Sequence, residues 1–454
     1  MNTAAKKTAK RRQVAKSAAR AKAPAKGSQA AKKTSAVPEI PDVRLNRKNV
    51  VIAQSGGPTM VINASLVGAV EVMQSIRELY PDFKFGKILG AKHGVEGILK
   101  SDYIDLTKLR ESTLAKLLTT PSSALGSCRH KPDAEDCRKI FEEFKRRNVG
   151  FFFYIGGNDS ADAARIVAEE AESEGYPLVV YHIPKTIDND LRSCDHTPGF
   201  GSAARFVASA IRGDDLDNRA LGGVKIDVIM GRDAGFLTAA SALARAAEDD
   251  GPHLVYLPEV PFSLDKFVKD VNNVVKRLGR CVVAVSEGIR GKDGVPIGAT
   301  LGAKETDSHG NVQMSGTGAL GDYLAKAVKA SGVKRVRADT FGYLQRSFPG
   351  VQSEVDVDEA RHCGAFAVLF AVKSARGEGV HSKGTVGIVR ADETVRGKKR
   401  YGVDYISLPI RDAAKYTRSL PKQFIAKSGV DVTQAFLDYA RPIVGELPDT
   451  VTLF

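Results

Sequence analysis

The chain has 454 residues and 43% hydrophobic content, enough for two or three domains with sizeable cores. No apolar run reaches the roughly 18–20 residues that a membrane span needs, and the N-terminus lacks the apolar segment of a secretory signal. We therefore expect no membrane association. Five widely spaced cysteines without a C-x-x-C pair predict thiols in a reducing compartment, with the cytoplasm as the expected location.

The net charge of +14 belongs mainly to the N-terminus. Residues 1–37 hold eleven Lys or Arg and no Asp or Glu, so the rest of the chain carries only +3. This Ala- and Lys-rich stretch has too little apolar surface to fold, which predicts a disordered tail and linker over residues 1–45. It could be a solvated tail without a role, an arm that contacts polyanions nonspecifically, or an organelle-targeting peptide.

From Asn49 onward, short apolar runs alternate with helical patterns. Strands that are apolar on both faces and separated by helices are typical of a doubly wound α/β protein with mainly parallel sheets. In such sheets, ligands bind in the loops that follow the strands. The pattern predicts helices over 61–80 and after 157 through 174, and strands over 50–53, 149–155, 178–183, 226–230, 254–257, 281–285 and 385–389.

Two of these loops are glycine-rich turns, at 56–57 and 156–157, and each precedes a helix. Paired glycines let backbone N–H groups approach an anion, and the helix N-terminus adds a favourable dipole, although a plain tight turn explains either pair alone. We predict that Ser160 caps the second helix. Asp159 would repel a phosphate unless a metal ion lies between them, so it indicates a metal site.

The loop after the strand at 178–183 combines a cation with two carboxylates. Lys185 precedes Asp188, and Asp190 follows two residues later. A general base must accept a proton from a hydroxyl, and a nearby cation must stabilise a transferring phosphoryl group. This loop offers both, and the alternative is a surface turn rich in Asp and Asn.

Basic residues recur on other loops, and guanidinium groups bind phosphates through two parallel hydrogen bonds. Such a set can hold a sugar phosphate, although each arginine alone is more often a surface ion-pair partner. Glu287, at a strand end, can accept hydrogen bonds from sugar hydroxyls. The arginines are Arg129, Arg232, Arg337 and Arg346.

Together these motifs resemble the phosphofructokinase family over roughly residues 48–380. GGNDS alone would be weak, because NAD kinases and diacylglycerol kinases have a similar loop. The whole set in the right order makes chance agreement a poor explanation. In chain order it is GGPTMVINAS, AKHGVEGIL, LGSCRHK, IGGNDS, PKTIDND, TPGFGSAAR, IMGRDAG, LPEVPF, VSEGI and GYLQRS.

The resemblance implies that Asp188 is the base that activates the 1-hydroxyl of fructose 6-phosphate, with Lys185, Thr186 and Arg232 completing the catalytic set. Asn158 and Asp159 match the place of a Mg²⁺ contact. The residues that match the phosphoryl-donor site are Gly57, Arg129, Gly157, Asp159, Ser160 and Lys185.

The sugar-phosphate site is implied in the same way. Arg337 matches an arginine that, in bacterial ATP enzymes, crosses from a neighbouring subunit, which implies a homodimer or homotetramer. The full set that matches sugar-phosphate contacts is Thr186, Asp188, Asp190, Met230, Gly231, Arg232, Glu287, Arg337, Tyr343 and Arg346.

Two positions distinguish the donor. ATP-using relatives usually have glycine at the position of Asp159, because the α-phosphate must pass close to the backbone, and they tend to have glycine at the position of Lys185. Pyrophosphate-using relatives carry lysine there, so pyrophosphate is expected. The alternatives are an ATP-dependent 6-phosphofructokinase and, from another class, a non-catalytic scaffold whose tail binds a polyanion.

The sequence departs from the family's pattern at three places. Asn158 stands where Asp, a Mg²⁺ contact, is common, which leaves the identity of the metal ligand open. Asp233 stands where many pyrophosphate enzymes have His. Gly223 or Lys225 occupies the place of the second bridging arginine of ATP enzymes.

The expected activity is reversible, Mg²⁺-dependent transfer between pyrophosphate and fructose 6-phosphate, giving fructose 1,6-bisphosphate and phosphate in glycolysis and gluconeogenesis. Sedoheptulose 7-phosphate stays open as a further substrate. The expected domains are a tail and linker over 1–45, a donor domain with the catalytic loop over 46–199, a sugar-phosphate domain over 200–345, and a segment over 346–454 that completes both.

Overall fold

The computed structural model describes most of the chain, and the predicted tail lies, up to residue 44, outside the described part. In the described part, no helix combines the length and the apolar character that crossing a membrane requires. The described residues are 45–192, 194–301, 318–395, 398–414 and 417–453.

The chain divides into two compact units, and it passes between them several times. The first unit comprises the described residues up to Lys185, together with Leu191–His196 and Asp358–Tyr416. The second comprises Thr186–Asp190, Thr197–Val357 and the described residues from Thr417 onward.

The first unit contains a seven-stranded sheet. Its inner strands pair in parallel, and the two edge strands, β3 and β13, pair antiparallel with their neighbours. In sheet order the strands are β13 (Val403–Pro409), β10 (Lys383–Arg390), β5 (Val179–Pro184), β4 (Val149–Gly156), β1 (Asn49–Gln54), β2 (Ile88–Ala91) and β3 (Tyr103–Asp105).

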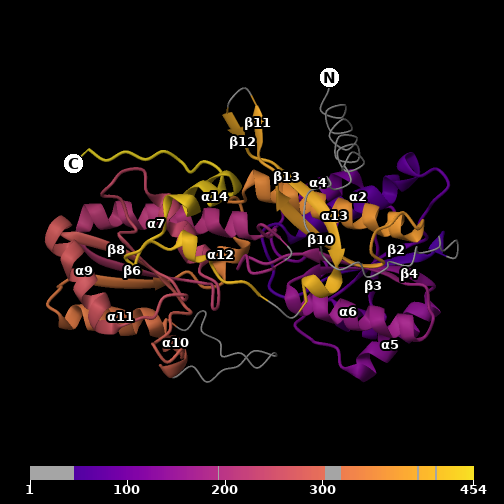
Figure 1. Cartoon of the computed structure of the whole chain (residues 1–454), viewed down its shortest axis with the longest axis horizontal. Helices are drawn as coiled ribbons and strands as arrows, with labels where there is room; N and C mark the ends of the chain where they lie inside the picture. Colours follow the sequence, from indigo (N-terminus) through magenta and orange to yellow (C-terminus); the bar gives the residue numbers. More distant parts are fainter. Residues whose placement is uncertain (1–44, 193, 302–317, 396–397, 415–416, 454) are drawn as a thin grey trace, which may run out of the picture. The chain divides into compact units, whose positions relative to one another are not determined.

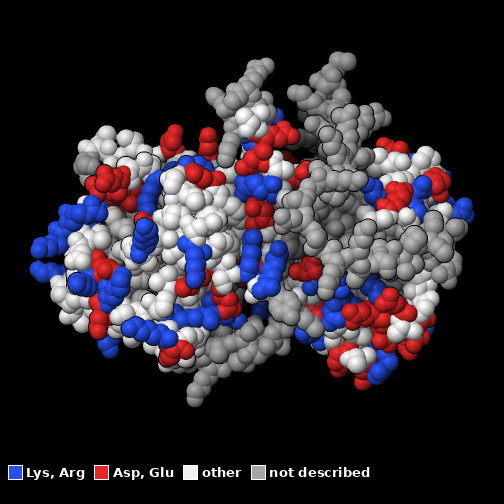
Figure 2. Space-filling model, viewed as in Figure 1, with Lys and Arg blue, Asp and Glu red and all other residues white. Residues whose placement is uncertain are grey.

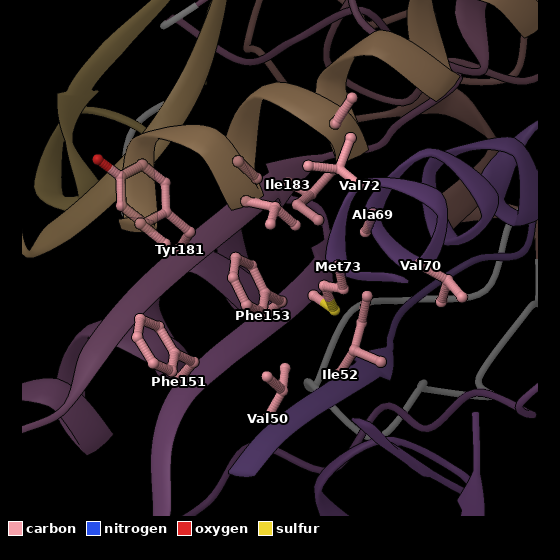
Figure 3. Packing of buried hydrophobic residues seen from close by; sticks show 14 of the residues in the cluster. Val50, Ile52, Ala69, Val70, Val72, Met73, Phe151, Phe153, Tyr181 and Ile183 are labelled. Carbon is pink, nitrogen blue, oxygen red and sulfur yellow. The ribbon is translucent and has the colours of Figure 1, made fainter. Parts of the chain in front are cut away.

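Helices cover both faces of this sheet, because alternate side chains of each strand point to opposite faces and both sets are apolar. On one face, Val50 and Phe153 pack against Met73 of α2 (Ile62–Leu79) in the cluster that Figure 3 shows. α13 (Glu354–Ala375) contributes to the same cluster. α5 (Ala134–Arg146) and α6 (Asn158–Ser173) cover the other face (Figure 1).

α2 and α13 approach so closely that glycine is required on both. A Cβ added to Gly68 would lie 1.8 Å from the carbonyl oxygen of Arg361, and one added to Gly364 would lie 1.9 Å from that of Ser65. The smaller elements of this unit are α3 (Val95–Leu99), α4 (Glu111–Leu117), the hairpin of β11 (Glu393–Val395) and β12 (Lys398–Arg400), and the 3₁₀ turn η3 (Ile410–Asp412).

Acidic and basic side chains are interspersed on the outer surface of α5 and α6, as Figure 2 shows. Arg165 pairs with Asp162 at 2.8 Å, and Lys145 pairs with Glu174 at 3.3 Å. The mixture of signs gives this surface no strong potential of one sign.

The second unit contains a four-stranded, fully parallel sheet in the order β7 (Leu254–Tyr256), β8 (Arg280–Ser286), β6 (Gly223–Ile229) and β9 (Val336–Thr340). α9 (Leu264–Leu278) and α11 (Ala319–Ala330) pack on one face, and α7 (Phe200–Leu221) covers the other (Figure 1). The remaining elements are α8 (Phe236–Ala240), η2 (Ser241–Ala244), α10 (Ile297–Thr300), α12 (Leu344–Ser347), η4 (Lys422–Phe424) and α14 (Gln434–Val444).

The predicted α/β class with mainly parallel sheets is confirmed, and each predicted strand and helix is present with ends shifted by at most three residues. The sequence analysis missed β2, β3, β9 and β13. Three of these are edge strands whose side chains are partly exposed, and β2 has only four residues. None of them therefore carries a long apolar run.

Candidate active site

In the first unit, three predicted loops meet because β1, β4 and β5 are neighbours in the sheet and end at the same edge. The Lys185 ammonium donates to the carbonyl oxygen of Gly57 at 2.7 Å, and the Lys185 backbone N–H donates to Gly156 at 2.9 Å. Lys185 is buried. Its ammonium is thus fixed at the first glycine-rich turn and its backbone at the second.

Gly56 has a φ of +74°, in the left-handed region that favours glycine, and a Cβ added there would lie 3.4 Å from the Lys185 ammonium. The residues just before Arg129 form hydrogen bonds with Gly56. The Gly56 N–H donates to the Cys128 carbonyl at 3.0 Å, and the Ser127 hydroxyl donates to the Gly56 carbonyl at 2.6 Å. Arg129 follows as an exposed side chain beside the first turn.

His182 supports the second turn from inside the sheet. Its imidazole is fully buried and lies 2.8 Å from the Gly156 carbonyl and 2.9 Å from the Thr385 hydroxyl. Burial lowers the pKa of His182 to about 4. The neutral ring therefore donates from Nε2 to Gly156 and accepts from Thr385 at Nδ1.

The start of α6 differs from the prediction. The helix begins at Asn158 with Gly157 as its N-cap, and no described side chain caps it, so the predicted capping role of Ser160 is wrong. Ser160 lies inside the first turn, and its hydroxyl occupies the space that a Cβ on Gly156 would need, 2.0 Å away. The serine packs on the turn instead of capping the helix.

The side chains of Asn158 and Asp159 stand in the first turn of α6. Asn158 is half-buried and Asp159 is exposed. Amide and carboxylate oxygens are ligands that suit Mg²⁺. The N-terminus of this helix favours negative charge, both that of Asp159 and that of a phosphate. The donor set therefore fits a Mg²⁺–phosphate group.

The predicted base lies in the second unit, on a loop held by its own hydrogen bonds. The Asp188 N–H donates to the Thr186 hydroxyl at 3.1 Å, and the Thr197 hydroxyl donates to the Thr186 carbonyl at 2.8 Å. Asn189 is fully buried with a φ of +58°, and its Oδ1 accepts from the Thr197 N–H at 3.0 Å. Asp188 and Asp190 remain half-buried on either side of Asn189.

Three segments that are predicted to bind the sugar phosphate meet at the carboxyl ends of β6, β8 and β9. The Met230 N–H donates to Gln345 at 3.2 Å, which ties it to the segment that carries Tyr343 and Arg346. Figure 1 places α12, where Gln345 lies, beside this end of the sheet. The Arg346 guanidinium lies 4.4 Å from the centre of the Tyr343 ring.

Gly231 and Glu287 belong to the same edge of the sheet. The Ser286 hydroxyl donates to the Gly231 carbonyl at 2.8 Å, and the Glu287 N–H donates to Ile229 at 2.8 Å. Glu287 is buried. The Nε of Arg232 is also buried and has no hydrogen-bond partner among the described residues.

Arg337, another predicted sugar-phosphate residue, is not part of this edge of the sheet. It is exposed and lies near the beginning of β9, whereas Tyr343 and Arg346 follow the end of that strand.

A group of three carboxylates that sequence analysis did not predict lies elsewhere in the second unit. Oxygens of Asp214, Asp227 and Asp339 lie within 4.8 Å of one another. The Lys225 ammonium is 3.3 Å from Asp214 and 3.8 Å from Asp227, and it also contacts Asp339. Burial and the Asp214 charge raise the pKa of Asp227 well above its usual range. The Lys225 ammonium thus offsets part of the negative charge of this cluster.

Sequence analysis missed the residues that hold these loops, namely Asn189, His182 and Gln345. Two of them stand inside the motifs PKTIDND and GYLQRS, and His182 lies two residues before the first of these. Their place in or beside these motifs was the only sign of their role in the sequence. Their hydrogen bonds join residues far apart in the chain, so no local sequence pattern predicts them.

Known proteins are similar to this chain in sequence and in fold. The phosphofructokinase family model matches residues 49–371. The pyrophosphate–fructose 6-phosphate 1-phosphotransferase of Rhodospirillum rubrum is 53% identical over 89% of this chain and 96% of its own. The enzyme of the same name from Xanthomonas campestris is 35% identical over 88% of this chain and 92% of its own.

A solved structure is similar as well. The pyrophosphate-dependent phosphofructokinase from Nitrosospira multiformis matches with a TM-score of 0.75 and 31% identity, over 90% of this chain and 94% of that chain. On these grounds the chain belongs to the phosphofructokinase family.

Proposed function

We propose that the protein transfers a phosphoryl group from pyrophosphate to the 1-hydroxyl of fructose 6-phosphate, giving fructose 1,6-bisphosphate and phosphate. The reaction is reversible and serves glycolysis and gluconeogenesis. The observation that carries the proposal is the buried Lys185, whose ammonium donates to the Gly57 carbonyl while its backbone N–H donates to Gly156. A fixed cation in this place suits a small, highly charged donor.

In this proposal, Asp188 takes the proton of the sugar 1-hydroxyl, and Thr186 and Asp190 orient the sugar beside it. Lys185 stabilises the charge of the transferring group. Arg232 and Arg346 bind the sugar phosphate as charged hydrogen-bond donors. Met230, Gly231, Glu287 and Tyr343 complete the sugar site, and Gly57, Arg129, Gly157 and Ser160 line the donor site.

Phosphofructokinases generally require Mg²⁺. We propose that Asn158 and Asp159 hold it, directly or through water. When bound, Mg²⁺ neutralises part of the pyrophosphate charge. Because Asn158 is neutral, Asp159 supplies the negative charge of this site.

Several finer points belong to the same proposal. The first unit serves as the donor domain and the second as the sugar-phosphate domain. The active form is a homodimer or homotetramer in which Arg337 reaches the sugar phosphate of a neighbouring subunit, which its exposed place on the edge strand β9 supports. All five cysteines are buried free thiols, which suits the reducing cytoplasm.

The donor is tested by the initial rate of fructose 1,6-bisphosphate formation with pyrophosphate or ATP at equal Mg²⁺. We expect a strong preference for pyrophosphate. The double variant D159G/K185G should improve the use of ATP, because it removes the carboxylate that blocks the α-phosphate. The control K100G/D102G makes the same charge changes on an exposed turn. No gain for D159G/K185G over the control would refute the assignment of these positions.

The tail is tested by deletion of residues 1–37. If the protein is an enzyme with a tail that contacts polyanions, turnover stays nearly unchanged while binding to heparin disappears together with its salt dependence. A non-catalytic scaffold would show no turnover with either donor before the deletion.

A further inference from the structure

A short segment near the C-terminus contacts the loop that carries the predicted base. The Arg418 backbone N–H donates to the Asp190 carbonyl at 2.8 Å. Its guanidinium donates from Nε to the Asn189 carbonyl at 2.9 Å and from a terminal nitrogen to Asn189 Oδ1 at 3.0 Å. One arginine thus holds both the backbone and the side chain of the residue next to Asp188.

Asn189 needs this support because its backbone is in the left-handed region, with a φ of +58°. A non-glycine residue there costs energy, and the surrounding structure must hold it. α14 supplies the remaining partner, since the Asn189 amide donates to the Tyr439 hydroxyl at 2.8 Å. Figure 1 shows α14 lying along α7, within the same unit.

The same segment also contacts the loop that carries Arg232. The guanidinium of Arg418 lies 5.1 Å from the centre of the Phe236 ring, at the start of α8. Two residues on, the Leu420 N–H donates to Glu259 Oε1 at 2.8 Å, and that oxygen also accepts the Gly235 N–H at 2.8 Å. Gly235 ends the loop 230–235. Glu259 therefore joins this loop to the C-terminal segment.

From these contacts we propose that Arg418 and Glu259 are positioning residues, and that segment 417–420 couples the loop of the base to the loop of the sugar-phosphate arginine. The inference rests on the proposed role of Asp188. Neither residue needs to touch the substrate. Arg418 holds Asp188 in place through Asn189, and Glu259 holds the Arg232 loop through Gly235.

Arg418→Ala should lower kcat about 100-fold, because a displacement of about 1 Å at a reacting group costs a factor of this order. The KM for fructose 6-phosphate should change by less than about 3-fold, since the residue does not bind the sugar. Arg418→Lys cannot make two parallel hydrogen bonds to Asn189 and should keep an intermediate kcat. Added guanidinium ion should restore part of the kcat of R418A.

Glu259 can be tested with a matched pair. Burial raises the pKa of this carboxyl group, and one oxygen accepts both backbone hydrogen bonds. Glu259→Gln keeps an acceptor oxygen in a side chain of the same shape and should behave nearly as wild type. Glu259→Ala should raise the KM for fructose 6-phosphate about 10-fold. The loss of kcat/KM, expressed as a free energy, should be smaller in the double variant R418A/E259A than the sum of the losses in the two single variants, because both residues act on one segment.

The control is Arg212→Ala. This arginine lies in the same unit and also donates to backbone carbonyls, those of Ala244 and Pro448, away from both loops. Its kcat and KM should stay within about 2-fold of wild type. Urea midpoints of all variants show whether each protein is folded, and R418K and E259Q preserve the test if an alanine variant fails to fold.

The outcomes separate the two proposals. If wild type turns over fructose 6-phosphate with pyrophosphate or ATP and folded R418A keeps its kcat within about 2-fold, the positioning role is overturned and the proposed function stands. An equal loss of kcat in R212A and R418A would also overturn the positioning role, since general structural damage would then explain the loss in R418A. Wild-type inactivity with both donors would overturn both proposals.

Discussion

Raising the pH above 9 should remove a buried positive charge from the first unit. The imidazole of His196 is 1% exposed and lies between two acids, with Nδ1 2.9 Å from Asp195 and Nε2 2.5 Å from Glu359. The Tyr401 hydroxyl donates to Glu359, and Arg390 pairs with Asp195 at 3.1 Å. The protonated ring is thus shared by two carboxylates, that of Asp195, which follows the predicted catalytic loop, and that of Glu359 in α13.

The surroundings of His196 determine how much the unfolding free energy changes with pH. Burial alone would lower the pKa of His196, but the Glu359 charge and the hydrogen bonds to Asp195 and Glu359 outweigh it and raise that pKa to about 9 from the usual 6.5. Stability from a raised pKa is complete below the unfolded value and is lost as the pH rises through the folded value. These two pKa values give a loss of about 2.5 kcal/mol between pH 7 and pH 10.

Urea unfolding of wild type and His196→Gln between pH 7 and pH 10 measures this loss. Glutamine can hydrogen-bond to both acids but does not titrate. The difference in unfolding free energy between the two proteins should therefore shrink by about 2.5 kcal/mol over this range. Taking the difference cancels the lysines, tyrosines and cysteines that titrate in both proteins.

His130→Gln is the matched control, because His130 pairs with Asp136 at 2.6 Å but its side chain is 41% exposed. Solvent screens this exposed pair, so the replacement serves as a control for the loss of a paired imidazole at the surface. If the difference in unfolding free energy between wild type and H196Q stays constant from pH 7 to pH 10, His196 is not a buried cation and the reasoning fails.

Three further predictions concern other parts of the molecule. Because burial lowers the pKa of His182 to about 4, the unfolding free energy should fall as the pH drops from 6.5 toward 4. In urea titrations over this range, wild type should lose about 3 kcal/mol more than His182→Gln. Parallel curves for the two proteins would contradict this prediction. Gly364→Ala should destabilise the protein by about 1–3 kcal/mol because its Cβ would meet the Ser65 carbonyl. In Gly213→Ala the new Cβ would meet no described atom within 4 Å apart from its own helix backbone and chain neighbours, so this change should stabilise the protein by about 0.4–1 kcal/mol. A reversed order of the two urea midpoints would exclude this packing. Asp188→Asn should lower kcat about 10²–10⁴-fold with an unchanged urea midpoint, and a kcat near wild type would exclude it as the base.

The local features of this protein could be predicted from its sequence because each depends on neighbouring residues. The run at 149–155 is apolar at nearly every position, so it forms a strand that is buried on both faces. The glycines at 56–57 and 156–157 mark turns, and the spacing of Lys185, Asp188 and Asp190 marks a loop with a cation and two acids. The prediction failed where two local signals competed, since Gly157 and not Ser160 became the N-cap of α6.

Which loops meet was decided by the tertiary structure. β5, β4 and β1 are adjacent in the sheet but not in chain order, so only their pairing brings Lys185 to Gly57, 128 residues away in the sequence. In the same way, Thr186–Asp190 packs with the second unit although Lys185 belongs to the first, and Arg418 reaches Asn189 across 229 residues. The physical reason is that strand order and loop contacts follow from the burial of all strands and helices together. Most elements and the chemistry of their loops could therefore be predicted from neighbouring residues, whereas the packing of the whole chain decided which of those loops meet.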